Sequence, residues 1–115
     1  MSVEPLTLES VPGQAAGSRI LRLSGPLTLS GLFEFQSTLR NDPPPSLILD
    51  LTAVPYMDSA GMGAIINYFV SCQRAGRKMV VVGVNGRVLE LFKITKVDAL
   101  LTIVDTVSEA ERSLA

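Results

Sequence analysis

The segment from Tyr56 to Gly63, YMDSAGMG, contains the residues whose chemistry is most informative. The Ser59 hydroxyl directly follows the Asp58 carboxylate, and Gly61 and Gly63 come shortly after. In one interpretation, Asp58 or Ser59 caps a helix by accepting a hydrogen bond from its first backbone N–H groups. In the other, Ser59 is a surface hydroxyl that accepts a phosphoryl group, and the glycines let another protein approach the backbone. The glycines alternatively serve tight packing of the helix start on a sheet, and spacing alone favours the cap.

Few other side chains in the chain could do chemistry. Histidine is absent, which removes the commonest general base and metal ligand. Cys72 is the single cysteine, so the chain can form neither an internal disulfide nor a Cys-rich zinc site. The segment lacks the Gly-Lys-Ser/Thr of a phosphate-binding loop and the glycine pattern of a hydrolase nucleophile elbow. We therefore expect no catalytic residue, no metal and no cofactor.

Composition limits the class of protein. The chain has 115 residues, of which 47% are apolar and 18% charged, and this predicts one folded domain over residues 1–115. A formal net charge of −1 means that the chain has no excess of positive charge of the kind that attracts nucleic acid. No apolar run approaches the roughly 20 residues that span a bilayer, and the first residues do not resemble a signal peptide. We expect a cytoplasmic protein without a membrane span.

Strands and helices alternate around the Asp58-Ser59 segment. The predicted elements are strands over 3–11 and 19–23, a helix over 30–40 capped by Ser30, a strand over 47–51, a helix over 59–75, a strand over 79–84, a helix over 87–94, a strand over 100–104 and a C-terminal helix capped by Thr106 or Ser108. The first two strands form an antiparallel hairpin. The later strands, separated by helices, pair in parallel, which predicts an α/β fold.

Several side chains on these elements have alternative interpretations. The helix over 59–75 carries a buried stripe made of Met62, Ile65, Ile66 and Phe69. Gly76 ends that helix in the left-handed conformation, and Cys72 is a small core residue on its buried side. Asp50 either binds a ligand or has a structural role, in which it points to a strand end or hydrogen-bonds a turn, and the structural role is favoured. Phe33 lies off the apolar stripe of its helix, so it either contacts a partner or packs on the hairpin.

Three segments resemble STAS domains of the anti-sigma factor antagonist family. They are Leu47 to Thr52 (LILDLT), Met57 to Gly63 (MDSAGMG) and Val88 to Phe92 (VLELF). The resemblance covers nearly the whole chain, and the Asp-Ser-x-Gly segment is its most specific part. It implies a single STAS-like α/β domain whose mixed sheet of four to five strands is flanked by about four α-helices. It also implies no catalytic activity, and it places Ser59 at the family's phosphoacceptor position.

The resemblance further implies a partner-switching cycle. The unphosphorylated protein would bind an anti-sigma factor, a serine kinase with a histidine-kinase-like ATPase fold, and so free the sigma factor. That kinase would phosphorylate Ser59, and a PP2C-type phosphatase would reset the protein. The expected partner contacts are Thr28, Asp58, Ser59, Ala60, Gly61, Met62, Gly63 and Asn67, since Ala60, Gly63 and Asn67 share the helix face away from the buried stripe.

The chain departs from the family at several positions. Thr28 stands in place of an aspartate, Gly31 in place of a threonine, Ala60 where serine or threonine is common, and Lys96 where glycine is frequent. In the family the aspartate replaced by Thr28 lies near the phosphoacceptor, so we expect partner contacts and phosphorylation geometry around Ser59 to differ here. Two alternatives stay open. One is a STAS subunit of a stressosome-like or lipid-transporter ATPase assembly without a phosphorylation switch. The other is a weak nucleotide-binding protein, with a phosphate at the helix N-terminus.

Overall fold

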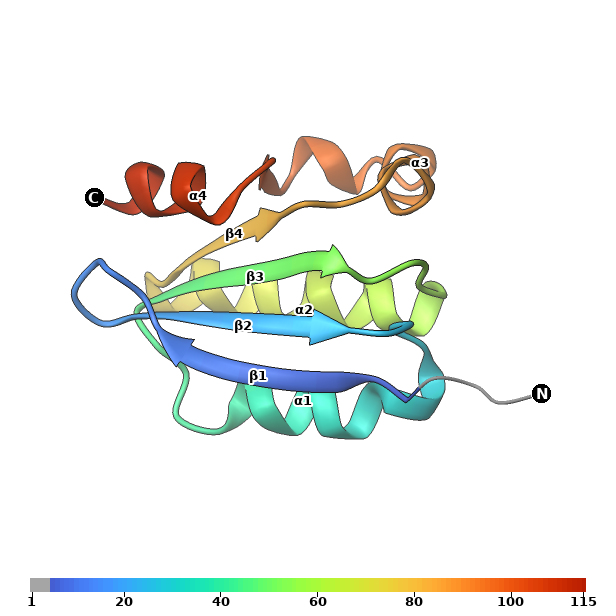
Figure 1. The fold of residues 1–115 in the computed structure, drawn as a ribbon, viewed down its shortest axis with the longest axis horizontal. Helices are drawn as coiled ribbons and strands as arrows, with labels where there is room; N and C mark the ends of the chain where they lie inside the picture. Colours follow the sequence, from blue (N-terminus) through green and yellow to red (C-terminus); the bar gives the residue numbers. More distant parts are fainter. Residues whose placement is uncertain (1–4) are drawn as a thin grey trace.

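A computed structural model describes residues 5–115, which form a mixed five-stranded sheet in the order β1-β2-β3-β4-β5 (Figure 1). The strands are β1 (Thr7–Pro12), β2 (Ser18–Ser24), β3 (Ser46–Ala53), β4 (Lys78–Val82) and β5 (Thr102–Val104). The α-helices are α1 (Leu32–Arg40), α2 (Ser59–Ala75), α3 (Gly86–Ile94) and α4 (Val107–Leu114), with 3-10 turns η1 (Leu29–Gly31) and η2 (Val97–Ala99). The predicted α/β fold class and element order are confirmed.

The strand pairing explains why the chain alternates between strands and helices. β1 pairs with β2 antiparallel, so a short hairpin suffices between them. The pairs β2–β3, β3–β4 and β4–β5 are all parallel, and parallel neighbours need a crossover connection. In the register, Leu21 pairs with Leu49 and Leu49 pairs with Val81, so apolar side chains line up across the central strands.

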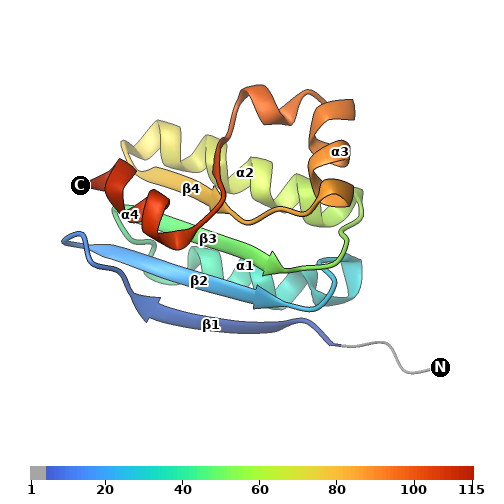
Figure 2. The ribbon, with the colours of Figure 1, turned by 45° about the horizontal axis from the view of Figure 1, so that its top comes forward.

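Helices cover both faces of the sheet, which is why β3 and β4 are almost continuously apolar. Figure 2 shows α1 and α2 on one face and α4 on the other. The larger core lies under α1 and α2 and includes Leu49, Phe35 and Ile65. The smaller core lies under α4, where Ala110 packs with residues such as Ile48. No helix within residues 5–115 has both the length and the hydropathy that a membrane crossing requires.

The start of the first helix differs from the prediction. Ser30 does not cap a helix; it lies within the 3-10 turn η1, and α1 begins only at Leu32, after Gly31. The Ser30 hydroxyl lies 3.1 Å from the Thr28 hydroxyl instead. A serine cap is unnecessary here because the Leu29 N–H donates to a side chain elsewhere in the chain, Asp58, and the Gly31 N–H donates to the Thr28 carbonyl.

The buried side of α2 is rotated relative to the predicted stripe. Met62 and Ile65 are buried as predicted, but Ile66 and Phe69 are only partly buried. The helix turns Gly61, Ala64, Tyr68 and Cys72 inward as well, because it packs against α1 in addition to the sheet. Cys72 is therefore a core residue, as predicted.

Other boundaries move by a few residues. Gly76 ends α2 with a left-handed φ of 70°, and Thr106 rather than Ser108 caps α4, by accepting from Glu109 N at 3.1 Å. The strand predicted over 3–11 begins at Thr7, and residues 3 and 4 lie outside the described part of the chain. The last strand is shorter than predicted, because the turn η2 takes up the chain before it.

Candidate functional site

Asp58 caps helix α2 just beyond the carboxyl end of β3. Its backbone is extended (φ −99°, ψ −178°), and its Oδ1 accepts a hydrogen bond from Gly61 N at 2.9 Å. Ser59 is then the first residue of the helix, and it is exposed. The structure thus resolves the choice of cap in favour of Asp58. Among residues 5–115, the Ser59 hydroxyl takes part in none of the side-chain hydrogen bonds, and both Asp58 oxygens bond to other groups.

The second oxygen of Asp58 joins α2 to a distant segment. Oδ2 accepts from Leu29 N at 3.0 Å, and Asp58 N donates to the Leu27 carbonyl at 3.2 Å. Leu27 N donates in turn to the Tyr56 carbonyl at 3.1 Å. The connection before α1 therefore lies directly beside the connection before α2, and Thr28 belongs to the same site as Ser59.

The two glycines of the segment have different roles. A Cβ atom on Gly61 would overlap the Leu27 carbonyl oxygen, so glycine permits the close approach of the helix to the Leu27 segment. A Cβ atom on Gly63 would meet nothing within 4 Å. Packing therefore explains Gly61, whereas Gly63 leaves open surface next to Ala60.

The Asp58 carboxylate is held in its charged form. The hydrogen bond from Gly61 N–H, supported by those from the Leu29 and Ala60 N–H groups, lowers the pKa of Asp58, against an opposing effect of burial. The partial positive charge at the start of α2 favours the same state. Ser59 therefore lies at the N-terminus of α2, next to the negative charge of Asp58.

The predicted contact residues differ in how far they reach the surface. Ser59 and Asn67 are exposed, whereas Thr28, Asp58, Ala60 and Gly63 are half-buried. Gly61 and Met62 are buried, and the Met62 sulfur accepts a hydrogen bond from the Thr95 hydroxyl at 3.3 Å. These last two residues shape the site from beneath and offer little surface to a partner in this conformation.

Exposed apolar side chains lie on the segments that build this site, the loop before α2 and the start of α1 with η1. Leu29 is 69% exposed and Phe33 is 83% exposed, which rules out the alternative that Phe33 packs on the hairpin. Tyr56 is also exposed, and the Arg87 guanidinium lies over its ring at 5.2 Å. The position of Phe33 off its stripe signalled its exposure. Nothing in the sequence pattern signalled Leu29, whose type and neighbours are equally typical of a buried residue.

Asn85 is a further supporting residue that sequence reasoning missed. Its Oδ1 caps α3 by accepting from Val88 N at 2.8 Å. Its Nδ2 donates to the carbonyls of Pro55 at 3.0 Å and Val54 at 3.3 Å, in the loop that leads to Asp58. The signal available was an asparagine three residues before an apolar helical position, which is a common cap pattern.

Asp50 makes local contacts within the sheet. Asp50 Oδ1 accepts from the Thr52 backbone N–H at 3.0 Å and from its hydroxyl at 2.6 Å, which agrees with the predicted structural role, although both residues lie within β3 and not in a turn. Within residues 5–115, no three side chains of the metal-binding types come together. The chemistry that the site offers is thus that of one exposed hydroxyl beside a carboxylate.

Comparison with known proteins places this geometry in a family. Residues 9–110 match the profile of the STAS domain. The chain belongs to the STAS domain family. The anti-sigma-B factor antagonist of Listeria monocytogenes is 37% identical to it over 57 residues, which is 50% of either chain. The match thus spans only half the length of that relative.

Solved STAS-domain structures share the fold. A Thermotoga maritima protein superposes with a TM-score of 0.83 at 23% identity, covering 93% of both chains. The anti-sigma factor antagonist SpoIIAA superposes in its unphosphorylated form with a TM-score of 0.76 at 14% identity, covering 90% of this chain and 92% of its own. At these identities the likeness establishes the fold alone.

Proposed function

We propose that this protein is an anti-sigma factor antagonist regulated by phosphorylation of Ser59. The observation that carries the proposal is the exposed Ser59 hydroxyl at the first position of α2, directly after the Asp58 cap, in a STAS domain. The name of the Listeria relative supports the regulatory role. In this role the protein acts by binding, and the unphosphorylated form holds an anti-sigma factor so that the sigma factor is released.

The binding surface is built around Ser59. Ala60, Gly63 and Asn67 continue it along α2, and Thr28 joins it through the hydrogen bond between Leu29 N and Asp58. Leu29 and Phe33 add exposed apolar surface at one side. A partner that covers Ser59 would bury these apolar side chains too, and their burial would supply much of the affinity.

Phosphorylation of Ser59 would end the complex by charge and size. A phosphoserine adds roughly −1.5 to −2 charges at neutral pH. It would stand beside the Asp58 carboxylate, whose own charge is secured by backbone N–H groups. The N-terminus of α2 stabilises the added charge within the domain, so the fold persists. A partner surface shaped for a neutral serine would reject it.

The kinase in this scheme is the anti-sigma factor itself, which has a histidine-kinase-like ATPase fold. It transfers a phosphoryl group from ATP to the Ser59 oxygen, and the hydroxyl proton leaves. A PP2C-type phosphatase later hydrolyses the phosphate ester and restores the binding form. Both steps need an accessible hydroxyl, and Ser59 is exposed at the start of α2.

Affinity capture from native extract tests the proposal with four baits: the unmodified protein, Ser59→Ala, Ser59→Asp and Ser108→Asp. Ser108 is a matched control because it is also an exposed serine in the first turn of a helix. We expect a histidine-kinase-like ATPase to be retained by all baits except Ser59→Asp. Capture of one partner by all four would instead indicate a STAS subunit of a constitutive assembly, and absence of such an ATPase from every bait would contradict the proposal.

A further inference from the structure

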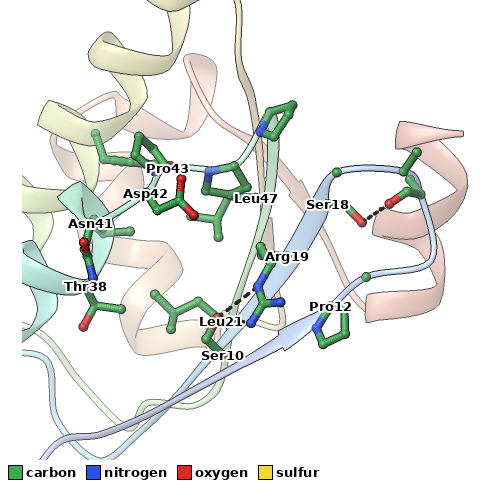
Figure 3. A pocket seen from close by; sticks show the side chains of 18 of the residues that line it. Ser10, Pro12, Ser18, Arg19, Leu21, Thr38, Asn41, Asp42, Pro43 and Leu47 are labelled. Atoms are coloured by element: carbon green, nitrogen blue, oxygen red, sulfur yellow. Dashed lines mark hydrogen bonds between the residues drawn. The ribbon is translucent and has the colours of Figure 1, made fainter.

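A groove of about 780 Å³ lies at the end of the sheet away from Ser59, between the β1–β2 hairpin loop and the loop from α1 to β3 (Figure 3). It exists because α1 ends at Arg40 and the chain returns through Pro43, Pro44 and Pro45. The groove opens beside the amino-terminal ends of β2 and β3, between the end of α1 and these prolines. Leu21, Leu39, Leu47 and Tyr68 form its apolar floor.

Two opposite charges face this groove without counter-charges. Figure 3 shows Arg19 of β2 and Asp42 of the α1–β3 loop on opposite sides of it. The Arg19 guanidinium donates from Nη2 and Nε to the Ser10 hydroxyl, at 3.0 and 3.3 Å. The ion pairs found among residues 5–115 both involve Arg22, on the other face of the sheet. Arg19 and Asp42 therefore keep their charges available to a ligand.

The position of Arg19 within its strand is unusual. Side chains alternate between the faces of a strand, so Arg19 shares the face of Leu21 and Leu23, which are fully buried. A guanidinium on a core-facing position is unfavourable unless it reaches water or a polar partner. The Ser10 hydroxyl is such a partner, and the groove lets the guanidinium reach water or a ligand as well.

Tyr68 lines the groove floor, and its polar neighbours are Cys72 and Arg77. Its side chain is only 7% exposed, and its hydroxyl has no hydrogen-bond partner in the described part of the chain. Burial, with a smaller contribution from the neighbouring Cys72, raises the pKa of Tyr68 to about 12, so the hydroxyl stays protonated. Buried hydroxyl groups in proteins normally have a partner.

The groove is preformed. Gly17 has a left-handed φ of 75°, and a Cβ atom there would lie 3.1 Å from Pro45 Cγ, so the hairpin loop and the proline loop lie against each other. The Glu111 Oε2 atom of α4 accepts from Gln14 N at 2.6 Å and anchors the hairpin loop from below. A rigid site loses little conformational entropy when a ligand binds.

We propose that this groove binds a small zwitterion with an apolar body, of the class of the free apolar amino acids. Arg19 would hold the ligand's carboxylate, and Asp42 its ammonium group. The apolar body would cover Leu21 and Leu47 on the floor. A zwitterion pairs with both side chains, whereas a simple anion pairs only with Arg19 and a simple cation only with Asp42.

Amide chemical shifts of ¹⁵N-labelled protein, followed during titration with L-leucine, test this site. We expect saturable shifts at the groove residues and none at Ser59. The neutral analogue N-acetyl-L-leucine amide, which has the same side chain, should produce no saturable shifts. Saturable binding of the neutral analogue with the same affinity, or no saturable shift with leucine up to its solubility limit, would overturn the proposal.

Three variants locate the binding groups. Arg19→Gln and Asp42→Asn should each weaken leucine binding by roughly fivefold or more, since each removes one charge-assisted contact. Asparagine tolerates the left-handed φ of 53° at position 42, so the loop keeps its shape. Arg22→Gln removes the same charge from the opposite sheet face of the same strand and should leave binding unchanged. Equal binding by wild type and Arg19→Gln would contradict the assignment.

Discussion

At the scale of the residue, Asp58 connects the two halves of the candidate site. One oxygen caps α2 through Gly61 N, and the other holds Leu29 N, 29 positions earlier in the chain. The capping role could be predicted from the sequence, since aspartate before an apolar helical run is a common cap. The hydrogen bond between Asp58 and Leu29 could not be predicted, because local sequence patterns carry no information on contacts between segments so far apart in the chain.

Replacement of Asp58 should cost more stability than a simple cap does. We expect Asp58→Ala to lower the free energy of unfolding by about 2 kcal/mol, since it removes a cap and a second charge-assisted hydrogen bond. Chemical denaturation measures this change. The control is Asp105→Ala, which removes an exposed carboxylate. An equal, small effect of both substitutions would show that Asp58 does not hold the two segments together.

The pH dependence of stability should include a contribution from Asp58. Its pKa in the folded protein is lowered by the Gly61, Leu29 and Ala60 N–H groups, from an unfolded value of about 3.9. The stabilisation is therefore fully present above about pH 3.9 and is lost as the pH falls through the lowered folded pKa. Below about pH 4, the wild type should lose its stability advantage over Asp58→Asn. An advantage that grows with acidification would contradict this.

At the scale of the element, the sequence pattern predicted the order of strands and helices but not all of their ends. Apolar runs and helical spacing are local properties, so β3, β4 and α2 were found close to their observed ranges. The turn η1 was not predicted, because its N–H groups donate hydrogen bonds to the Asp58 side chain and the Thr28 carbonyl, and Ser30 does not act as a cap. The buried side of α2 differs from the predicted stripe because α1 also packs against this helix.

The two glycines near the start of α2 should respond oppositely to alanine. Gly63→Ala should raise the free energy of unfolding by up to about 1 kcal/mol, because alanine favours helix and a Cβ atom there meets open space. Gly61→Ala should lower it despite the same helix preference, because the Cβ atom would overlap the Leu27 carbonyl. Urea denaturation of both variants provides the comparison, and a change of the same sign in both would refute the assigned packing role of Gly61.

At the scale of the whole molecule, the proposed functions occupy opposite ends of one sheet. The start of α2 and the β1–β2 hairpin lie at the two ends of the long axis in Figure 1. Parallel pairing could be predicted from the alternation of strands and helices, and it places the carboxyl ends of β2 and β3 together. The groove could not be predicted, because it depends on where α1 stops relative to the hairpin loop.

The phosphomimetic variant should keep the whole fold. Ser59 is exposed at a helix N-terminus, where a negative charge is stabilising by about 0.3 to 1 kcal/mol. We therefore expect Ser59→Asp to melt at the same temperature as the wild type or slightly above it, in a calorimetric scan. Ser59→Asp should also bind leucine at the distant groove as the wild type does. A markedly lower melting temperature would mean that loss of partner binding by this variant reflects unfolding.

The central claim is that the charge state of Ser59 controls partner binding. Isothermal titration calorimetry of the captured ATPase, against protein with unmodified Ser59 and against protein phosphorylated at Ser59, tests it most directly. The account predicts tight binding of the unmodified protein and an affinity lower by roughly 100-fold or more after phosphorylation, which corresponds to about 2.7 kcal/mol. Equal affinity of the two forms would contradict it, and Ser59 would then be only the first residue of a well-capped helix.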